Sequence, residues 1–266
     1  MAERLDAMPR SLVSACIITF NEADRIADCI RSVGWCDEIL VVDSHSTDRT
    51  RELAAELGAR VIERDWPGHV AQKEFAIRAA QHDWVFCIDA DERISPELRG
   101  ELMALRDAGF PGAVGWKMPR MSCYLGRWIR HGTWYPDLSL RLFDRRHGRW
   151  GGMNPHDRVE LDCVPGRLRH PLLHYPYRSL VEHLQTIDRY TTISAQEMSR
   201  AGRRAGVRDF VLRPLFAFVR FYWLRLGCLD GWRGLLLAYL HAHYTRMKYA
   251  KLFVLARPTE PANPPR

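Results

Sequence analysis

Short apolar segments alternate with amphipathic helical segments along roughly the first 110 residues, and this alternation strongly limits the folds open to the chain. The apolar segments are short and rich in β-branched residues, as buried strands are; they are residues 12–20, 38–43, 59–64 and 84–88. A segment with helical spacing follows each of them. Strands that alternate with helices in this way predict a parallel sheet with right-handed crossovers.

Polar residues in front of three of these helices match the pattern of N-caps. Asn21 with Asp24 resembles a capping box, and Ser46 or Thr47 is placed to cap the second helix. Ser95, with a proline directly after it, is the expected start of the helix after the fourth strand.

The pattern changes in the second half of the chain. Residues 113–119 and 138–144 have the character of strands, and an aromatic, basic loop at residues 124–137 separates them. From Ser179 to about Ala256 the chain is predicted to be helical. A proline-rich tail follows, at residues 257–266, which we expect to be disordered.

Composition narrows the class of protein. The chain has 266 residues, of which 47% are hydrophobic, and a net charge of +7, so anionic partners are expected. Seven cysteines form no CxxC pair, which favours a reducing compartment. The N-terminus has no signal-peptide pattern, and no segment reaches the roughly 20 apolar residues of a membrane span. We therefore expect a cytoplasmic protein.

Three carboxylates stand together after the fourth strand: Asp89, Asp91 and Glu92. In an open α/β sheet ligands bind beyond the carboxyl ends of the strands. Asp43 and Glu22 also stand at or just after the carboxyl end of a predicted strand. A divalent cation with phosphate oxygens would offset the repulsion among these acids, since Mg²⁺ prefers oxygen ligands. The alternative is a solvated acidic turn in front of the next helix.

Four segments resemble the family 2 glycosyltransferases in their order and spacing: ACIITFNE (15–22), EILVVDSHSTDRT (38–50), AQKEFAI (71–77) and FCIDADE (86–92). The resemblance continues through LRLFDRR (140–146), HDRVE (156–160) and the last helix, and it is nearest to the bacterial branch with the lipopolysaccharide inner-core β-glucosyltransferases. It implies an α/β fold of the GT-A type, a Rossmann-like, mostly parallel sheet flanked by helices. From the composition of the last part of the chain we expect a C-terminal helical, membrane-associating extension.

The resemblance also divides the chain. Residues 1–112 would form the nucleotide-sugar-binding half of the GT-A domain and residues 113–178 the acceptor-binding half. Residues 179–256 would form the helical region.

Roles of single residues follow from the resemblance. The UDP-sugar donor would be bound by Thr19, Glu22, Asp43, Lys73 and Asp89. Asp91 would reach a divalent metal, Mg²⁺ or Mn²⁺, that bridges the diphosphate. Asp157 would be the base that takes the proton of the acceptor hydroxyl, as inversion requires; its alternative is an ordinary turn residue.

The chain departs from its relatives at two positions. His156-Asp157 stands where relatives commonly carry His-Glu, so the carboxylate reach is one methylene shorter. His45 stands where relatives often have glycine, and it is expected to be a loop residue facing solvent or a donor contact. For His174 we expect a structural role or a place on the acceptor side.

A phosphorylated or otherwise anionic acceptor would suit the basic loop, because arginine binds phosphate bidentately and aromatic faces stack on sugars. The acceptor would be bound by Arg127, Arg130, Trp134, Tyr135 and His156. The alternative is a surface of ion pairs.

Residues 210–227 combine large apolar side chains with arginines, a composition typical of helices that lie in a membrane interface. The alternatives are a helix pair packed on the catalytic domain or on a second subunit of a homo-oligomer.

The sequence thus predicts an inverting, metal-dependent hexosyltransferase that uses a UDP-sugar, with glucose as the expected hexose. A lipopolysaccharide core or another cell-envelope glycan would be the acceptor, and the protein would be peripheral on the inner face of the inner membrane. One alternative is a nucleotidyltransferase that makes nucleotide sugars, although the segment 19–26 lacks the expected glycine-rich phosphate loop. Another is a basic, non-enzymatic membrane-binding protein. Nucleic acid is not an expected partner, because a surface that binds nucleic acid neutralises phosphates with cations, and acids clustered at strand ends would not contribute to this.

Overall fold

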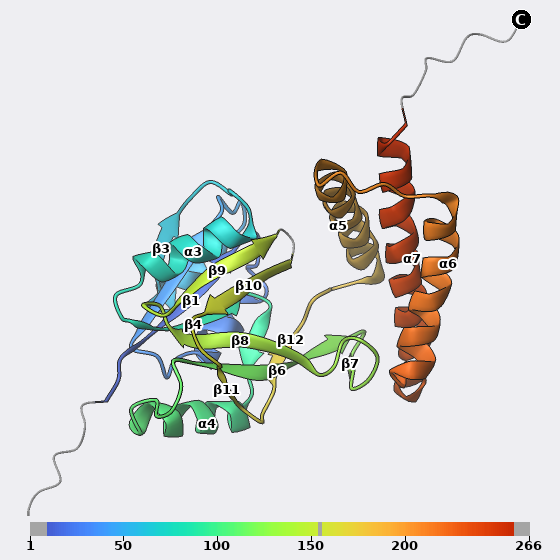
Figure 1. Cartoon of the computed structure of the whole chain (residues 1–266). Coiled ribbons are helices and arrows are strands. Elements are labelled where there is room, and N and C mark those ends of the chain that lie inside the picture. Colours follow the sequence, from blue (N-terminus) through green and yellow to red (C-terminus); the bar gives the residue numbers. More distant parts are fainter. Residues whose placement is uncertain (1–9, 154–155, 258–266) are drawn as a thin grey trace, which may run out of the picture. The chain divides into compact units, whose positions relative to one another are not determined.

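The computed structural model describes residues 10–153 and 156–257, except for the side chains of Met153 and His156. The chain forms two compact units (Figure 1). The first contains the residues up to Cys123 together with Pro136–Pro176, and the second contains Tyr124–Tyr135 and the residues from Tyr177 onward. The basic loop therefore shares a unit with the C-terminal helices.

The first part of unit one has the predicted alternation of strands and helices. In chain order the elements are β1 (Val13–Thr19), α1 (Ile26–Ser32), β2 (Glu38–Asp43), α2 (Thr50–Glu56), β3 (Arg60–Glu63), α3 (His69–Ala79), β4 (Trp84–Asp89), β5 (Glu92–Ile94) and α4 (Pro96–Asp107). The pairs β1–β2, β1–β4 and β2–β3 are parallel, as predicted.

The later strands complete a mixed sheet in the order β3-β2-β1-β4-β8-β6-β12-β5. They are β6 (Gly115–Tyr124), β8 (Asp137–Asp144), β11 (Gly166–Arg167) and β12 (Leu172–His174). The strand β8 runs antiparallel to both of its neighbours, β4 and β6. A separate hairpin is formed by β9 (Gly148–Met153) and β10 (His156–Leu161). The predicted α/β class, a mostly parallel sheet flanked by helices, is confirmed.

Helices cover both faces of this sheet. Along β1, alternate residues enter two different cores: Val13, Ala15 and Ile17 pack with α1, α2 and α4, whereas Cys16 and Ile18 pack with α3. A strand whose two faces are both buried has no polar face, which explains the near-continuous apolar run in the sequence.

Two predicted helix starts are wrong. The helix α1 begins at Ile26 and α2 at Thr50, and neither has a side-chain cap. The side chain of Asn21 instead accepts a hydrogen bond from the Thr47 amide at 2.8 Å, and Ser46 Oγ accepts one from the Asn21 amide at 2.8 Å. The apparent caps therefore join the loops after β1 and β2. The cap at Ser95 is confirmed, since its hydroxyl accepts from the Leu98 amide.

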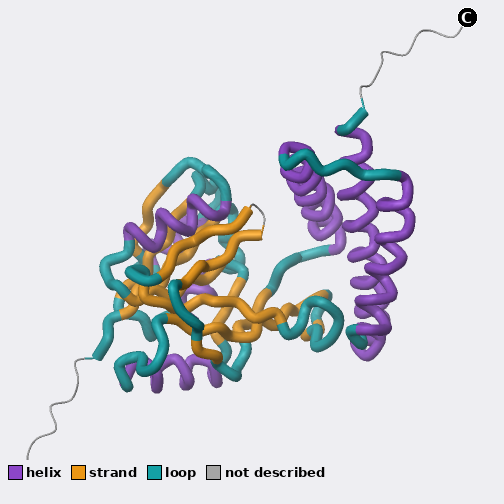
Figure 2. Tube along the Cα trace, in the orientation of Figure 1, coloured by secondary structure: helices purple, strands orange, loops and turns teal. Residues whose placement is uncertain are grey.

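The second unit is mostly helical (Figure 2). Its elements are β7 (Arg127–Trp128), α5 (Leu180–Arg200), α6 (Val207–Val219), a π-helix η1 (Arg220–Leu224), a 3₁₀-helix η2 (Gly227–Asp230) and α7 (Gly231–Leu255). Its core joins the basic loop to the helices, with Tyr124 and Ile129 packed against Phe221 and Leu237. Among the helices in the described ranges, none has the length and apolar character needed to cross a membrane.

Candidate active site

The carboxyl ends of three adjacent parallel strands bring the predicted donor-binding residues to one edge of the sheet. Thr19 ends β1, Asp43 ends β2 and Asp89 ends β4. In the strand register Thr19 lies opposite Asp43, and Ile18 lies opposite Asp89. Parallel strands place their ends together in this way, so residues that are 24 and 46 positions from Asp43 become neighbours.

Thr19 and Asp43 each present a buried polar atom without a partner. Within residues 10–153 and 156–257, Thr19 Oγ1 and Asp43 Oδ1 have no hydrogen-bond partner. The other oxygen of Asp43 accepts a bond from the Ser46 amide at 2.7 Å, which fixes the carboxylate. An unpaired buried oxygen costs about 1–3 kcal/mol, so a ligand with an N–H or O–H group at this edge would be stabilised.

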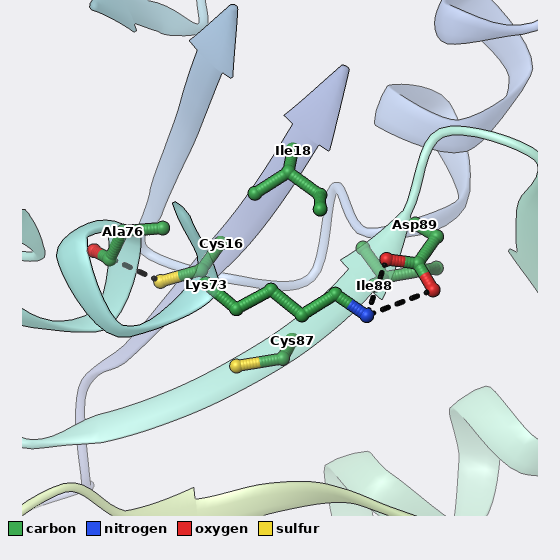
Figure 3. A pocket seen from close by; sticks show the side chains of 7 residues that line it. All are labelled: Cys16, Ile18, Lys73, Ala76, Cys87, Ile88 and Asp89. Carbon is green, nitrogen blue, oxygen red and sulfur yellow. Dashed lines mark hydrogen bonds and ion pairs between the residues drawn. The ribbon is translucent and has the colours of Figure 1, made fainter. Parts of the chain in front are cut away.

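Lys73 is the centre of the site. It extends from α3, and its ammonium group lies 3.0 Å from Asp89 and 2.9 Å from Asp157 of β10. Its aliphatic stem crosses a small pocket above β1 and β4 (Figure 3). Burial would lower the pKa of Lys73, but the carboxylates beside it raise the pKa above its ordinary value. The lysine therefore stays charged and bridges the end of the central sheet to the β9–β10 hairpin.

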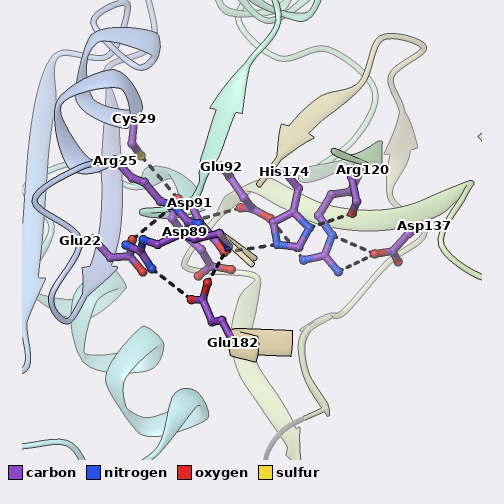
Figure 4. A network of polar contacts seen from close by, with 12 residues as sticks. Glu22, Arg25, Cys29, Asp89, Asp91, Glu92, Arg120, Asp137, His174 and Glu182 are labelled. Atoms are coloured by element: carbon purple, nitrogen blue, oxygen red, sulfur yellow. Dashed lines mark hydrogen bonds and ion pairs between the residues drawn. The ribbon is translucent and has the colours of Figure 1, made fainter. Parts of the chain in front are cut away.

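The acidic cluster is already partly neutralised by the chain itself (Figure 4). Arg141 of β8 lies 3.0 Å from Asp89 and 2.6 Å from Glu92, and Arg120 of β6 lies 3.4 Å from Glu92. Glu92 is fully buried, and it also accepts a bond from the Asp89 amide at 3.0 Å. The expectation that a bound cation offsets the repulsion of all three acids is thus wrong for Glu92, which is a structural residue.

These contacts also fix the charge of Asp89. Burial alone would raise the pKa of this carboxyl, but the cations of Lys73 and Arg141 hold the pKa well below its usual range. Asp89 is therefore a carboxylate at any ordinary pH. Its side chain remains 26% exposed, which leaves an edge that a ligand can reach.

Asp91 has a different partner from the other two acids. Its Oδ2 lies 3.4 Å from Nε2 of His174, which ends β12, and the Nδ1 of His174 lies 2.9 Å from the hydroxyl of Ser122. A carboxylate and an imidazole whose second nitrogen is held by a hydrogen bond form a donor set typical of divalent-metal sites. In the described part of the chain no group of three or more such ligands occurs, so diphosphate oxygens would have to complete the coordination of a metal.

The remaining predicted donor and catalytic residues lie on loops or on the hairpin. Glu22 lies on the β1–α1 loop, with its carboxylate 3.8 Å from Arg25. Asp157 lies opposite Gly152 in the hairpin, and its side chain is 13% exposed. For His156 the backbone pairs with Met153, but its side chain lies outside the described residues.

The predicted acceptor residues Arg127, Arg130, Trp134 and Tyr135 belong to the second unit. The side chains of Arg127 and Arg130 are exposed. The backbone amides of Arg130 and His131 donate to the buried carboxylate of Asp230, which holds the loop on the helices. The ring of Trp134 packs against Tyr124.

Sequence reasoning missed three residues of the site network. No local pattern pairs Arg141 or Arg120 with the acidic cluster, and Ser122 carried no signal because serine is common in every kind of segment. For His174 the predicted alternatives were support of the structure or a place on the acceptor side; its contact is Asp91. His45 has φ 59, is exposed and is hydrogen-bonded to Asp65 at 2.9 Å, which fits the predicted solvent-facing loop position.

Comparisons with known proteins give one family. The sequence model of glycosyl transferase family 2 matches residues 14–159. A lipopolysaccharide core biosynthesis glycosyltransferase of Rhizobium meliloti is 30% identical over 253 residues, which cover 92% of this chain and 93% of that protein. An uncharacterized glycosyltransferase of Rickettsia felis is 53% identical over 91 residues, 34% of this chain and 32% of that protein.

Two solved structures are also similar. Mannosyl-3-phosphoglycerate synthase from Rubrobacter xylanophilus is 20% identical, with a TM-score of 0.48 over 75% of this chain and 77% of that chain. Glucosyl-3-phosphoglycerate synthase from Mycobacterium tuberculosis, solved with Mn²⁺, UDP and phosphoglyceric acid, is 27% identical over 44% of each chain, with a TM-score of 0.35.

Proposed function

Because the chain belongs to glycosyl transferase family 2 and is a glycosyltransferase, we propose that it transfers a hexose from a UDP-sugar, with inversion, to an anionic cell-envelope glycan. The observation that carries this proposal is the position of Lys73, whose ammonium contacts Asp89 at the donor edge and Asp157 on the hairpin. A donor-binding carboxylate and a candidate base thus share one cation. Glucose is the hexose that the resemblance favours, and a lipopolysaccharide core is the acceptor that the Rhizobium relative's name suggests.

The donor would occupy the edge formed by β1, β2 and β4. Asp43 and Thr19 offer the unpaired oxygens that could accept from the uracil or the ribose, and Asp89 and Glu22 would accept from ribose hydroxyls. Lys73 would hold Asp89 in place and add positive charge near the diphosphate. These roles use groups that are already fixed, so little ordering is needed on binding.

A divalent metal fits the pair formed by Asp91 and His174, because the carboxylate oxygen and the imidazole Nε2 lie 3.4 Å apart and Ser122 orients the imidazole. When bound, Mg²⁺ or Mn²⁺ would supply positive charge to the diphosphate that leaves with the electron pair of the broken bond. The protein would supply orientation, through a short loop between β4 and β5 that is anchored by the buried Glu92.

Transfer requires that the acceptor oxygen forms a bond to the anomeric carbon while the bond from that carbon to the UDP oxygen breaks. The proton of the acceptor hydroxyl would pass to Asp157. This carboxylate is partly buried and held by Lys73, so its direction is fixed before the acceptor arrives. Inversion follows when the base and the leaving group act on opposite faces of the sugar.

Acceptor binding would involve the basic loop of the second unit, with Arg127 and Arg130 on phosphate or carboxylate groups and Trp134, Tyr135 and His156 on the sugar. The test is the double change Arg127→Ala with Arg130→Ala. We expect the KM for a phosphorylated core acceptor to rise while the KM for the UDP-sugar stays constant. An unchanged acceptor KM would remove the loop from recognition.

Membrane association is the proposed role of the C-terminal helices, which would make the protein peripheral on the inner face of the inner membrane. Large apolar side chains near the α6–α7 turn are strongly exposed, among them Trp223 at 60% and Trp232 at 59%. Anionic lipid would add about 1 kcal/mol for each nearby cation. Changing both tryptophans to serine should abolish flotation with vesicles that contain phosphatidylglycerol, and undiminished flotation would exclude this surface.

A panel of UDP-sugars, with UDP release measured with and without Mn²⁺, tests the function. We expect one UDP-hexose to be used in the presence of an acceptor and the reaction to stop on chelation. Release of pyrophosphate from a nucleoside triphosphate and a sugar phosphate would instead indicate a nucleotidyltransferase. Transfer from a different nucleotide-sugar would overturn the assignment of the donor.

A further inference from the structure

The helices α6 and α7 pack along each other (Figure 1). An open groove runs between them. Its cavity volume is about 200 Å³, and about 560 Å³ when the space open to solvent is included. Its lining includes Val211, Pro214, Leu215 and Phe218 of α6 with Tyr239 and Arg246 of α7.

The lining residues follow helical spacing. Along α6 the four lining residues follow one another at steps of three, one and three positions, and Tyr239 and Arg246 of α7 are seven positions apart. Each helix therefore presents one face to the groove. Leu215 is 63% exposed and Tyr239 is 62% exposed, although both are large. The groove is therefore an apolar surface that the described chain does not fill.

The charge around the groove is strongly positive. Residues 201–257 contain eleven lysines and arginines but only two acids, Asp209 and Asp230. The helix α7 contains no acidic residue. Asp209 is paired with Arg213 at 2.6 Å, and Asp230 is buried against the basic loop. Burial, together with the cations Arg213 and Arg203, lowers the pKa of Lys248 on α7.

Arg246 is the cation in the groove lining itself. Its side chain is exposed, and it has no carboxylate partner among the residues that the structure describes. A guanidinium beside an apolar surface fits an amphiphile whose polar end is an anion, because arginine binds phosphate with two parallel hydrogen bonds.

A second copy of this chain fits the groove less well. A two-fold interface would place the same surface of both copies together, and with few acids in this segment it would bring cations against cations. An anionic ligand instead offsets this repulsion. The charge of the groove therefore favours an anionic ligand over a second copy of the chain.

We propose that the α6–α7 groove binds the acyl chain of an anionic membrane phospholipid, whose phosphate pairs with Arg246. This inference rests on the membrane association proposed above and gives it a defined partner. It differs from adsorption to a charged surface because one lipid molecule would occupy one site.

The full-length chain can be titrated by calorimetry with dioctanoylphosphatidylglycerol below its critical micelle concentration. We expect saturation at one lipid per chain, with dioctanoylphosphatidylcholine bound about tenfold more weakly. Arg246→Gln should weaken binding of the phosphatidylglycerol about tenfold. It should weaken binding of the phosphatidylcholine less, because the choline cation already offsets the charge of the same phosphate. Leu215→Ser should weaken binding of both lipids.

Arg204→Gln is the matched control, since it removes the same charge from an exposed position that does not line the groove. It should bind as the unchanged protein does. Circular dichroism checks that each variant is folded; all three changed side chains are exposed. Equal affinities in all variants, or binding without saturation, would overturn the proposal. A dimer that Leu215→Ser dissociates, seen by sedimentation without lipid, would show that a second copy covers the groove instead. UDP release by the groove variants, measured with detergent-solubilised acceptor, should be unchanged. A wrong lipid-binding proposal and a wrong transferase assignment therefore give different experimental results.

Discussion

The ammonium group of Lys73 lies 2.9 Å from Oδ2 of Asp157, although 84 positions separate the two residues in the chain. The contact ties α3, which covers the sheet, to the β9–β10 hairpin. The same ammonium lies 3.0 Å from Asp89. Removal of the lysine would leave two partly buried carboxylates facing each other.

Lys73→Met should therefore lower both stability and donor affinity. We expect the free energy of unfolding to fall by about 2–3 kcal/mol, because an unpaired buried charge costs about that much. Urea unfolding measures the stability, and calorimetry measures UDP affinity. Lys73→Arg, which retains the charge, should keep most of the stability. Equal loss in both variants would mean that the ammonium charge does not stabilise the site.

Asp157→Asn should abolish transfer without weakening donor binding. The amide cannot accept the proton from the acceptor, and loss of a general base lowers turnover by about 10²–10⁴-fold. The rate is measured as UDP release and the affinity as Mn²⁺-dependent UDP binding. Asp157→Glu retains the carboxylate on a side chain one methylene longer, and should keep substantial activity. Near-normal turnover of the amide variant would remove Asp157 from the mechanism.

Metal binding is predicted to depend on His174 and on the hydrogen bond that its Nδ1–H donates to the hydroxyl of Ser122. Asp91→Asn and His174→Gln should each remove the gain in UDP affinity that Mn²⁺ provides. Ser122→Ala should lower the Mn²⁺ affinity about tenfold, since it removes only the group that orients the imidazole. His170, which is hydrogen-bonded to Glu101, offers a control. If His170→Gln and His174→Gln behave alike, His174 has no special place at the metal.

The second unit should lose stability in mild acid. Burial lowers the pKa of His183 to about 4, whereas an unfolded histidine titrates near about 6.5. Between these two pKa values His183 binds a proton in the unfolded chain but not in the folded chain. The contribution of the neutral histidine to the free energy of unfolding is therefore fully present above about pH 6.5 and is lost as the pH drops toward 4. The shift corresponds to a loss on the order of 3 kcal/mol.

Urea unfolding at a series of pH values checks this loss. His183→Gln can still bond to Tyr124, the partner of the histidine at 3.0 Å, but does not titrate. Its stability should depend less on pH in this window. Some dependence should remain from His241, whose pKa burial also lowers. An identical pH profile in the two proteins would contradict the assignment.

Gly132 is predicted to be the glycine of the basic loop that tolerates no side chain. It has φ +76, and an added Cβ would lie 2.4 Å from the ring of Phe221 in the core of the second unit. Gly126 has φ +77 but nothing within 4 Å. Gly126→Ala should therefore cost about 1 kcal/mol from backbone strain alone. Gly132→Ala should cost clearly more, and equal changes in thermal stability would show that the ring moves aside.

The predicted starts of α1 and α2 illustrate a limit of reading local sequence. Asn21, Ser46 and Thr47 have the right chemistry for helix caps, but the same side chains can bond to any backbone amide. Because β1 and β2 are adjacent in the sheet, their two loops lie within hydrogen-bond distance, and the polar groups join one loop to the other. A residue and its partner 26 positions away cannot be matched from periodicity alone.

The sequence by itself determined the α/β alternation, because burial on one or both faces imposes a period on apolar residues that is visible locally. It also placed Asp43 and Asp89 at strand ends, and hence at one edge of a parallel sheet. The partners of these acids were decided only by the tertiary structure. Arg141, Lys73 and His174 reach the edge from other elements, and their contacts depend on strand order and register, which no local pattern encodes.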